Sequence, residues 1–429
     1  MRANARILAL SVTALTVCVI PNGGAAAQEI GQITSIVISP QLDRTDVAGV
    51  RIEPEFTPEP IRAGPFVVVS SISIAGGYDT NVFDRTAEAG DAAVLVTPRL
   101  TLRADTSRHL LQVSAMGHVR RFASTGSENS EEFDVRAQTR LDLAERQALF
   151  ANASFGHQIE QRSSVGTTSA ADEPVNFDLA TAQVGADVEL GRLWLRPAAN
   201  FEQSNYSDIA IAGTDTDLSF RNSRRYGGQM AVGFNFSELF AAFGELGYSQ
   251  TESTDAAPGA RRDAEDMTFL VGVRGEVSPL VTAEFAVGYR RREYELPQFL
   301  DLDGFSYRAD VQWFITPLMT LRLEASQRFL NSGNVQVAGI LSNRVSVTGY
   351  FDPLRNLRLS ANVAYEQNDF REVDTVAKRP SMLFQAQYQA NRHLSLGVFA
   401  GLRRQEVSGA LLVQPFTSFS SGLGVTLTP

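Results

Sequence analysis

Apolar and polar residues alternate with a period of two from about residue 66 to the end of the chain. The stretch at 131–144, EEFDVRAQTRLDLA, carries apolar residues or threonine at alternate positions, with charged or amide residues between them. The stretches at 304–315 and 356–366 repeat this pattern. Such alternation is typical of a β-strand with one apolar and one polar face, here over segments of roughly ten to fourteen residues.

Short and long connections between these segments alternate as well. Longer loops rich in Asp, Glu, Ser, Thr and Gly occur at 162–176, 207–221 and 253–264. The stretches that begin at Val277, Ile315 and Phe351 resemble one another, which indicates a repeated hairpin unit. We expect short turns at 105–108, 144–146, 191–192, 237–238, 278–279, 316–317, 352–353 and 391–392.

Long strands with short turns at one end and long loops at the other are typical of an outer-membrane β-barrel. We therefore predict an all-β fold over residues 66–429, a transmembrane antiparallel β-barrel of about eighteen strands, with about sixteen as the alternative. The turns would be periplasmic and the loops extracellular. The barrel must close, because an open sheet edge would leave backbone groups unpaired in lipid. A soluble β-sandwich or solenoid is the other alternative, but its strands are usually shorter, about five or six residues.

Aromatic residues give an independent check, because such barrels carry aromatic girdles at both membrane interfaces. One group lies toward the long-loop ends of the strands, namely Tyr78, Phe122, Phe155, Tyr226, Tyr248, Tyr289, Phe305 and Tyr365. A second group lies near the short turns, namely Trp194, Phe236, Phe240, Trp313 and Phe351. Two separate bands are what a bilayer would select.

The start of the chain has the order of a secretory signal peptide. Two arginines precede an apolar run and a stretch of small residues, which predicts a signal at 1–27 and an extended, proline-containing periplasmic lead-in at 28–65. Cys18 is the only cysteine, so a lipoprotein anchor there is the alternative. Removing Arg2 and Arg6 with the signal takes the net charge from −10 to −12. A charge of this sign excludes the broad basic surface of a nucleic-acid binder.

The segment GGYDTNVF, Gly76 to Phe83, reads as the exit of the first strand, Ser70 to Tyr78, with a bend or bulge at the two glycines. Together with LVTPRLTLRAD and HLLQVSAMGHVRRF, it resembles the opening of an outer-membrane porin family, the beta-barrel porin 2 type associated with exopolysaccharide systems. The resemblance implies a polysaccharide-linked channel and supplies no catalytic residues. The final strand, with Ser421, Gly422, Val425 and Leu427, fits a signal for the barrel-assembly machinery, although the chain ends in Thr428 and Pro429 instead of an aromatic residue.

Arginine pairs and runs recur near the long-loop ends of the predicted strands, and Lys378 is the only lysine. Alternation divides these arginines between the two faces of the wall. We expect an inner arginine set at the pore mouth, Arg120, Arg225, Arg290, Arg292 and Arg403, and an outer arginine set at the lipopolysaccharide head groups, Arg121, Arg224, Arg291 and Arg404. The inner set could attract anionic solutes or sugar acids. The alternative is that it pairs with Glu245, Glu284 or Asp310 and only keeps the lumen wet.

Catalytic chemistry has little support in the sequence. His109 and His393 fall at periplasmic turns, His118 faces the predicted lumen, and His157 faces lipid near the outer rim. No serine arrangement, metal-ligand spacing or phosphate-binding loop accompanies them. We therefore expect no enzymatic activity, no metal and no cofactor.

The function predicted from these patterns is a channel for passive passage of small hydrophilic or saccharide solutes through the outer membrane. Barrels of about sixteen to eighteen strands generally enclose water, which favours a channel. The alternative is a non-conducting structural or interaction barrel that binds polysaccharide or envelope components. In that case a loop would fold into the lumen, and the candidates are 162–176 and 207–221.

Overall fold

Long antiparallel strands make up most of the chain in the structure, a computed structural model that describes residues 48–49, 53–164, 167, 171–409 and 413–429. The predicted signal peptide and most of the lead-in lie outside the described residues. The long strands are β2 (Phe66–Asp79), β3 (Asp91–Asp105), β4 (His109–Phe122), β5 (Ser130–Ala144), β6 (Gln147–Glu160), β7 (Val175–Leu190), β8 (Leu193–Tyr206), β11 (Ser223–Asn235), β12 (Phe240–Ser253), β13 (Ala264–Ser278), β14 (Val281–Tyr294), β15 (Leu302–Thr316), β16 (Met319–Asn331), β17 (Gly339–Leu354), β18 (Leu357–Phe370), β19 (Thr375–Gln389), β20 (Leu394–Ser408) and β21 (Phe416–Leu427).

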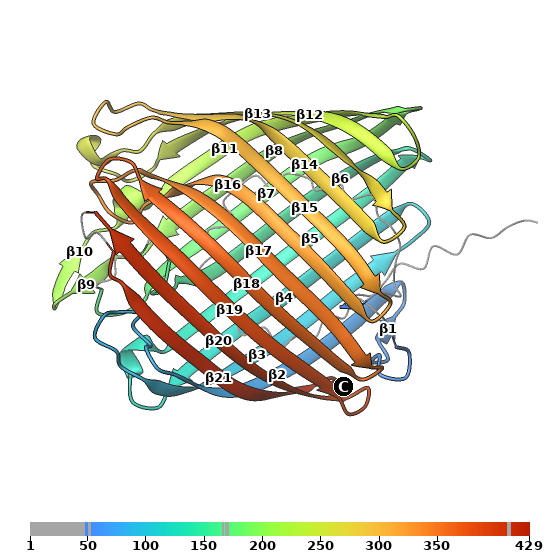
Figure 1. The fold of residues 1–429 in the computed structure, drawn as a ribbon, viewed down its shortest axis with the longest axis horizontal. Coiled ribbons are helices and arrows are strands. Elements are labelled where there is room, and N and C mark those ends of the chain that lie inside the picture. Colours follow the sequence, from blue (N-terminus) through green and yellow to red (C-terminus); the bar gives the residue numbers. More distant parts are fainter. Residues whose placement is uncertain (1–47, 50–52, 165–166, 168–170, 410–412) are drawn as a thin grey trace, which may run out of the picture.

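These strands pair in chain order and close on themselves. β2 pairs with β3 on one side and with β21 on the other, from Ile72↔Leu427 to Asp79↔Ser420. The result is a closed antiparallel barrel of eighteen strands, which confirms the predicted fold class and strand number. Closure leaves most of the sheet without a free edge, so most backbone groups of the wall are paired within it (Figure 1).

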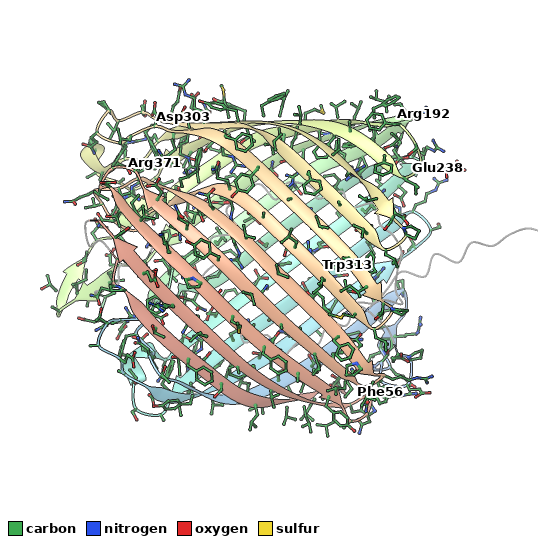
Figure 2. All side chains as sticks on the ribbon, in the orientation of Figure 1. Phe56, Arg192, Glu238, Asp303, Trp313 and Arg371 are labelled. Atoms are coloured by element: carbon green, nitrogen blue, oxygen red, sulfur yellow. The ribbon has the colours of Figure 1, made fainter. Side chains whose placement is uncertain are left out.

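The two ends of the barrel differ in their connections. Figure 2 shows Arg192 and Glu238 at one end, which we name the short-turn end, and Asp303 and Arg371 at the opposite, long-loop end. Gly191, at φ +68°, supplies the left-handed residue of its two-residue turn. The turn expected at 352–353 is displaced, because β17 continues to Leu354 through a register shift.

Short elements decorate the loops and the lead-in. The strand β1 (Ile61–Ala63) pairs with the start of β2. The hairpin of β9 (Ile209–Ile211) and β10 (Thr214–Thr216) extends beyond the barrel wall at the long-loop end (Figure 1). The 3-10 helices are η1 (Gly126–Glu128), η2 (Ser219–Arg221) and η3 (Pro258–Ala260). Within the described residues, no helix has the length and apolar character needed to cross a bilayer.

The alternation of the sequence becomes the two faces of the wall. On β15, Phe305 and Trp313 are exposed on the outer surface. Arg308 points the other way and reaches Glu284 of β14 at 3.0 Å and Glu245 of β12 at 3.2 Å. A side chain can reach a strand three places away only on the concave side, so the polar face lines the lumen.

Two details of the sequence interpretation are wrong. Trp194 is only 5 % exposed and packs on Phe243, so it lies inside the lumen and not in the girdle near the short turns. The expected bulge at Gly76 and Gly77 is absent, because β2 stays in register with β3 through to Asp79. Parity explains the first error, since even-numbered residues of β8 face inward.

Candidate functional site

The loop between β6 and β7, described at residues 161–164, 167 and 171–174, reaches across the lumen at Ser163, and we name it the crossing loop. The carbonyl oxygen of Ser163 accepts a hydrogen bond from Arg379 of β19. The Ser163 hydroxyl lies 3.4 Å from Nη1 of Arg403, on β20. Since β5, β4, β3, β2 and β21 separate β6 from β20 along the wall, these contacts join distant parts of the barrel.

Two buried ion pairs fix the base of the crossing loop. Arg162 donates to both carboxylate oxygens of Glu128 at 3.1 and 2.6 Å, and to the carbonyl oxygen of Ala171 at 2.8 Å. Arg221 donates to both oxygens of Glu160 at 2.9 and 2.7 Å. The four charged side chains are at most 5 % exposed. Such bidentate pairs satisfy charges that would otherwise be costly to bury.

Apolar contacts complete this anchor. Ala171, Val175, Ile209 and Leu218 form a buried cluster between the crossing loop and the loop at 207–222. Arg221 also lies 3.9 Å from the ring centroid of Tyr206, which adds a cation–π contact. Of the two loops named as candidate constrictions, 162–176 therefore contacts the far wall, while 207–221 helps to hold it.

A second loop, residues 80–90, packs beside Arg403. The guanidinium of Arg403 donates to Asp79 at 2.9 Å and to Asp84 at 3.1 Å. Burial raises the pKa of the Asp84 carboxyl from 3.8 to about 6, although the charge of Arg403 opposes that shift. Asn81 is fully buried and donates from its side-chain amide to Arg85 at 2.7 Å and to Thr417 at 3.1 Å. Asn81, which belongs to the segment GGYDTNVF, therefore stabilises the conformation of this loop.

The inner arginine set lies on the lumen face, in two groups. Arg120 and Arg403 line a recess beside the crossing loop. Arg225, Arg290 and Arg292 line another between β11 and β16.

Most of the inner arginine set is paired with carboxylates. Asp266 accepts from Arg225 at 2.8 Å and from Arg292 at 2.8 and 3.1 Å. Arg290 donates to the hydroxyl of Thr268 at 3.2 Å. Among the described residues, neither Arg290 nor Arg120 forms an ion pair. These two arginines are therefore the members of the set whose charge is least compensated.

The carboxylates named beforehand as partners of this set pair with other arginines. Glu245 and Glu284 pair with Arg308, and Asp310 pairs with Arg322 at 2.6 Å. The expectation of a lumen wall with mixed, paired charges fits the geometry, but the assignment of partners was wrong. Register decides the pairing, and the sequence alone does not give it.

The outer arginine set lies on the outer surface near the long-loop end. Arg121 pairs with Glu131, and Arg291 pairs with Glu293. Arg404 lies 2.8 Å from Glu406, and Arg224 donates to Gln203 at 3.3 Å. About half of the side-chain surface of Arg121, Arg291 and Arg404 stays exposed, so these guanidiniums keep N–H groups free for another ligand.

The histidines lie where parity suggested. His118 faces the lumen with Nδ1 3.2 Å from Thr97 Oγ1. His157 is on the outer surface, 2.7 Å from Asp178. Among the described residues, no three His, Cys, Asp or Glu side chains gather as metal ligands would. The expectations of no metal, no cofactor and no catalysis stay predictions.

Several residues of this site carry no signal in the sequence pattern. Glu128, Arg162 and Arg221 sit in loops, where alternation stops and parity says nothing about direction. Arg379 is an isolated arginine in its strand and belongs to none of the arginine pairs and runs. The arginine pairs and runs in the sequence therefore identify only some of the arginines that meet in the lumen.

Comparison with known proteins agrees with the barrel. The family model described as "Putative beta-barrel porin 2" matches residues 53–428. No curated protein is significantly similar to the chain. Among solved structures, OccAB3 of Acinetobacter baumannii is 11% identical, with 84% of this chain and 99% of that chain covered and a TM-score of 0.43.

Two further structures are similar at the same level. The siderophore receptor PirA of Pseudomonas aeruginosa is 11% identical over 87% of this chain and 81% of that chain, with a TM-score of 0.42. OpdO of Pseudomonas aeruginosa is 13% identical over 84% of this chain and 97% of that chain, with a TM-score of 0.43. Similarities this low carry no argument about function.

Proposed function

Since the chain belongs to the "Putative beta-barrel porin 2" family, we propose that it is an outer-membrane channel for small hydrophilic solutes, narrowed by the crossing loop. Passage would be passive diffusion down a concentration gradient. The outer surface of exposed apolar side chains suits lipid, and the charged inner face suits water. A wall of this strand number generally leaves room for an aqueous lumen.

The observation that carries this proposal is the contact of Ser163 with Arg379 and Arg403. A loop tied to the far wall divides the lumen at the long-loop end, so solutes must pass beside it. The sides of this passage carry guanidinium and carboxylate groups that replace the hydration of polar solutes by hydrogen bonds. Small hydrophilic solutes, saccharides among them, are the class that fits.

Arg120 and Arg290 support a preference for anions, because no carboxylate pairs with them among the described residues. Charged rings of this kind tune the selectivity of pores. Acidic saccharides combine the two chemistries, and the family resemblance to exopolysaccharide-associated proteins points to the same solutes. We propose that the channel exports or takes up such saccharides.

The test is single-channel conductance of refolded residues 28–429 in a planar bilayer under a salt gradient. We expect stable conductance steps, a reversal potential on the anion side, and interruption of the current by acidic oligosaccharides. Neutral oligosaccharides of the same length are the control for charge. Cation selectivity together with indifference to acidic sugars would contradict the proposed preference, while leaving the channel itself in place.

A non-conducting barrel is the second candidate, and two observations favour it. The crossing loop reduces the lumen at the long-loop end. In the lumen at the short-turn end, the Gly49 backbone N–H donates to Asp352 at 3.1 Å, and Gly49 lies against the Tyr350 ring. Protein that inserts and folds yet passes no current would favour this candidate.

The predicted partners belong to the same proposal. The outer arginine set would bind lipopolysaccharide phosphates, and the β21 strand would engage the barrel-assembly machinery. Replacing Arg121, Arg224, Arg291 and Arg404 with Gln should reduce lipopolysaccharide co-purification. Equal amounts on the wild-type and the quadruple variant would exclude that role for the four arginines.

A further inference from the structure

The pairing between β15 and β16 stops halfway along the two strands. Register runs from Thr316↔Met319 at the turn to Arg308↔Ser326 and ends there. On its other side, β15 stays paired with β14 as far as Leu302. Likewise, β16 stays paired with β17 as far as Asn331↔Gly339. Residues 302–307 and 327–331 therefore face each other without a ladder, in the part of the wall nearest the long loops.

The end of the β16–β17 hairpin leans into the lumen, which explains the separation. Arg292, a lumen residue of β14, donates to the Asn331 side chain at 3.0 Å. Arg262 donates to the carbonyl oxygens of Ser332 and Asn334. These contacts hold the tip of the hairpin toward the barrel axis, while β15 follows β14 along the wall. In Figure 1, β15 and β16 are neighbours on the near side of the barrel.

A cavity of about 330 Å³ lies on the lumen side of β11 to β16 and reaches this part of the wall. Residues 306–310 of β15 and 324–329 of β16 are among those that line it. The cavity therefore borders the unpaired segments of β15 and β16 from the lumen side. Its volume lies in the range of small-ligand pockets, about 300–1,000 Å³.

The chemistry of the cavity changes from its lumen side to its wall side. The lumen side carries Arg290, which has no ion-pair partner among the described residues. The wall side carries Phe329, whose ring centroid is 5.9 Å from the Arg290 guanidinium. Leu302 and Leu341 pack on Phe329. Across the gap, Tyr307 Oη of β15 donates to Asn343 Oδ1 of β17 at 3.2 Å, and Gln327 of β16 donates to the same oxygen at 3.1 Å.

We propose that the gap between β15 and β16 is a lateral opening that binds single-chain amphiphiles with an anionic head and passes them between lumen and membrane. This inference rests on the proposed function, because it requires the barrel to stand in a bilayer. The head group would pair with Arg290, which forms no ion pair among the described residues. The acyl chain would lie against Phe329 and Tyr307. Breaking the hydrogen bond of Tyr307 with Asn343 and parting Leu302 from Phe329, without breaking any strand ladder, would widen the passage.

The test is quenching of a small thiol-linked fluorophore by brominated amphiphiles, in vesicles and in a Cys18→Ser background. The probe at Ser326→Cys reports on the cavity, at Phe305→Cys on the lipid-facing surface, and at Gln138→Cys on the lumen far from the gap. Brominated fatty acid, at a pH at which it is ionised, is compared with the brominated fatty alcohol of the same chain length. We expect both to quench the Phe305→Cys probe and neither to quench the Gln138→Cys probe.

At Ser326→Cys we expect several-fold stronger quenching by the acid than by the alcohol. Adding Arg290→Gln should remove that preference, and Arg290→Lys should retain it. Quenching at Ser326→Cys no greater than at Gln138→Cys would overturn the lateral opening while leaving a membrane channel in place. No quenching at Phe305→Cys would instead count against the membrane location on which the proposed function depends.

Discussion

The two halves of the lumen are filled in different ways. In the half near the long loops, paired arginines and carboxylates project from the wall and from the crossing loop. In the half near the short turns, ion pairs such as Arg196 with Asp187 also occur, but aromatic rings lie flat on the wall beside them. Trp194 lies over Gly233, where an added Cβ would be 2.0 Å from the ring, and Phe243 lies over Gly272 at 2.5 Å.

The comparison teaches that one sheet geometry supports two kinds of interior. Charges need partners and water, so the long-loop half is held by specific ion pairs and can select solutes by charge. Rings need only space, so in the short-turn half the packing of Trp194 and Phe243 on glycines adds to the ion pairs and sets the shape of the lumen. The two halves should therefore respond to different substitutions.

The largest effect is expected from breaking the anchor of the crossing loop. Glu128→Ala leaves Arg162 buried without its carboxylate, which typically costs about 3–5 kcal/mol. We expect a lower unfolding temperature and a larger, noisier single-channel conductance as the loop leaves the far wall. The control is Glu131→Ala, which removes an exposed pair with Arg121 and should cost at most about 1 kcal/mol. Equal effects of the two variants would contradict the anchoring role.

The half near the short turns should lose stability when a methyl group is added beneath an aromatic ring. Gly233→Ala forces Trp194 off its position, and overpacking of this kind costs about 1–3 kcal/mol. We expect a lower unfolding temperature and a shift in tryptophan fluorescence, with ion selectivity unchanged. Gly247→Ala is the matched control, because its Cβ would meet Thr268 at an ordinary 3.7 Å. A change in ion selectivity in Gly233→Ala would contradict the assignment of charge selection to the long-loop half.

Selectivity should depend on which inner arginine is replaced. Arg120→Gln and Arg290→Gln should each move the reversal potential toward cations, because neither arginine forms an ion pair among the described residues. Two charges 4 Å apart interact by about 1 kcal/mol in water, so the permeability ratio should change by less than about fivefold. Arg225→Gln should change it less, since Arg225 already forms an ion pair with Asp266. A larger effect of Arg225→Gln would reverse this ranking.

The smallest effect is expected from pH. The pKa of Asp84 is raised to about 6, so folding takes up a proton between about pH 4 and pH 6. Its contribution to stability is thus fully present below about pH 4 and is lost as the pH rises through about 6. Below pH 6 the carboxyl loses its charge beside Arg403, and anion preference should rise slightly. Comparing reversal potentials at pH 7.5 and 5 checks this, and Asp84→Asn should remove that part of the change.

The sequence by itself determined the barrel, its strand number and the direction of most wall residues. Alternation with a period of two is a local property, so Arg290 and Arg291 could be assigned to opposite faces without any knowledge of their neighbours. Parity also places the Trp194 side chain in the lumen, although Trp194 lies near a short turn, where a girdle residue is expected.

The tertiary structure decided which side chains meet. Arg225 pairs with Asp266, and Ser163 contacts Arg379, although these residues are distant in the chain. The separation of β16 from β15 likewise depends on contacts with other parts of the barrel. Loops have no period, so nothing local directs Ser163 across the lumen. Strand register and loop packing are set by the closed barrel as a whole, because each depends on contacts that exist only after closure.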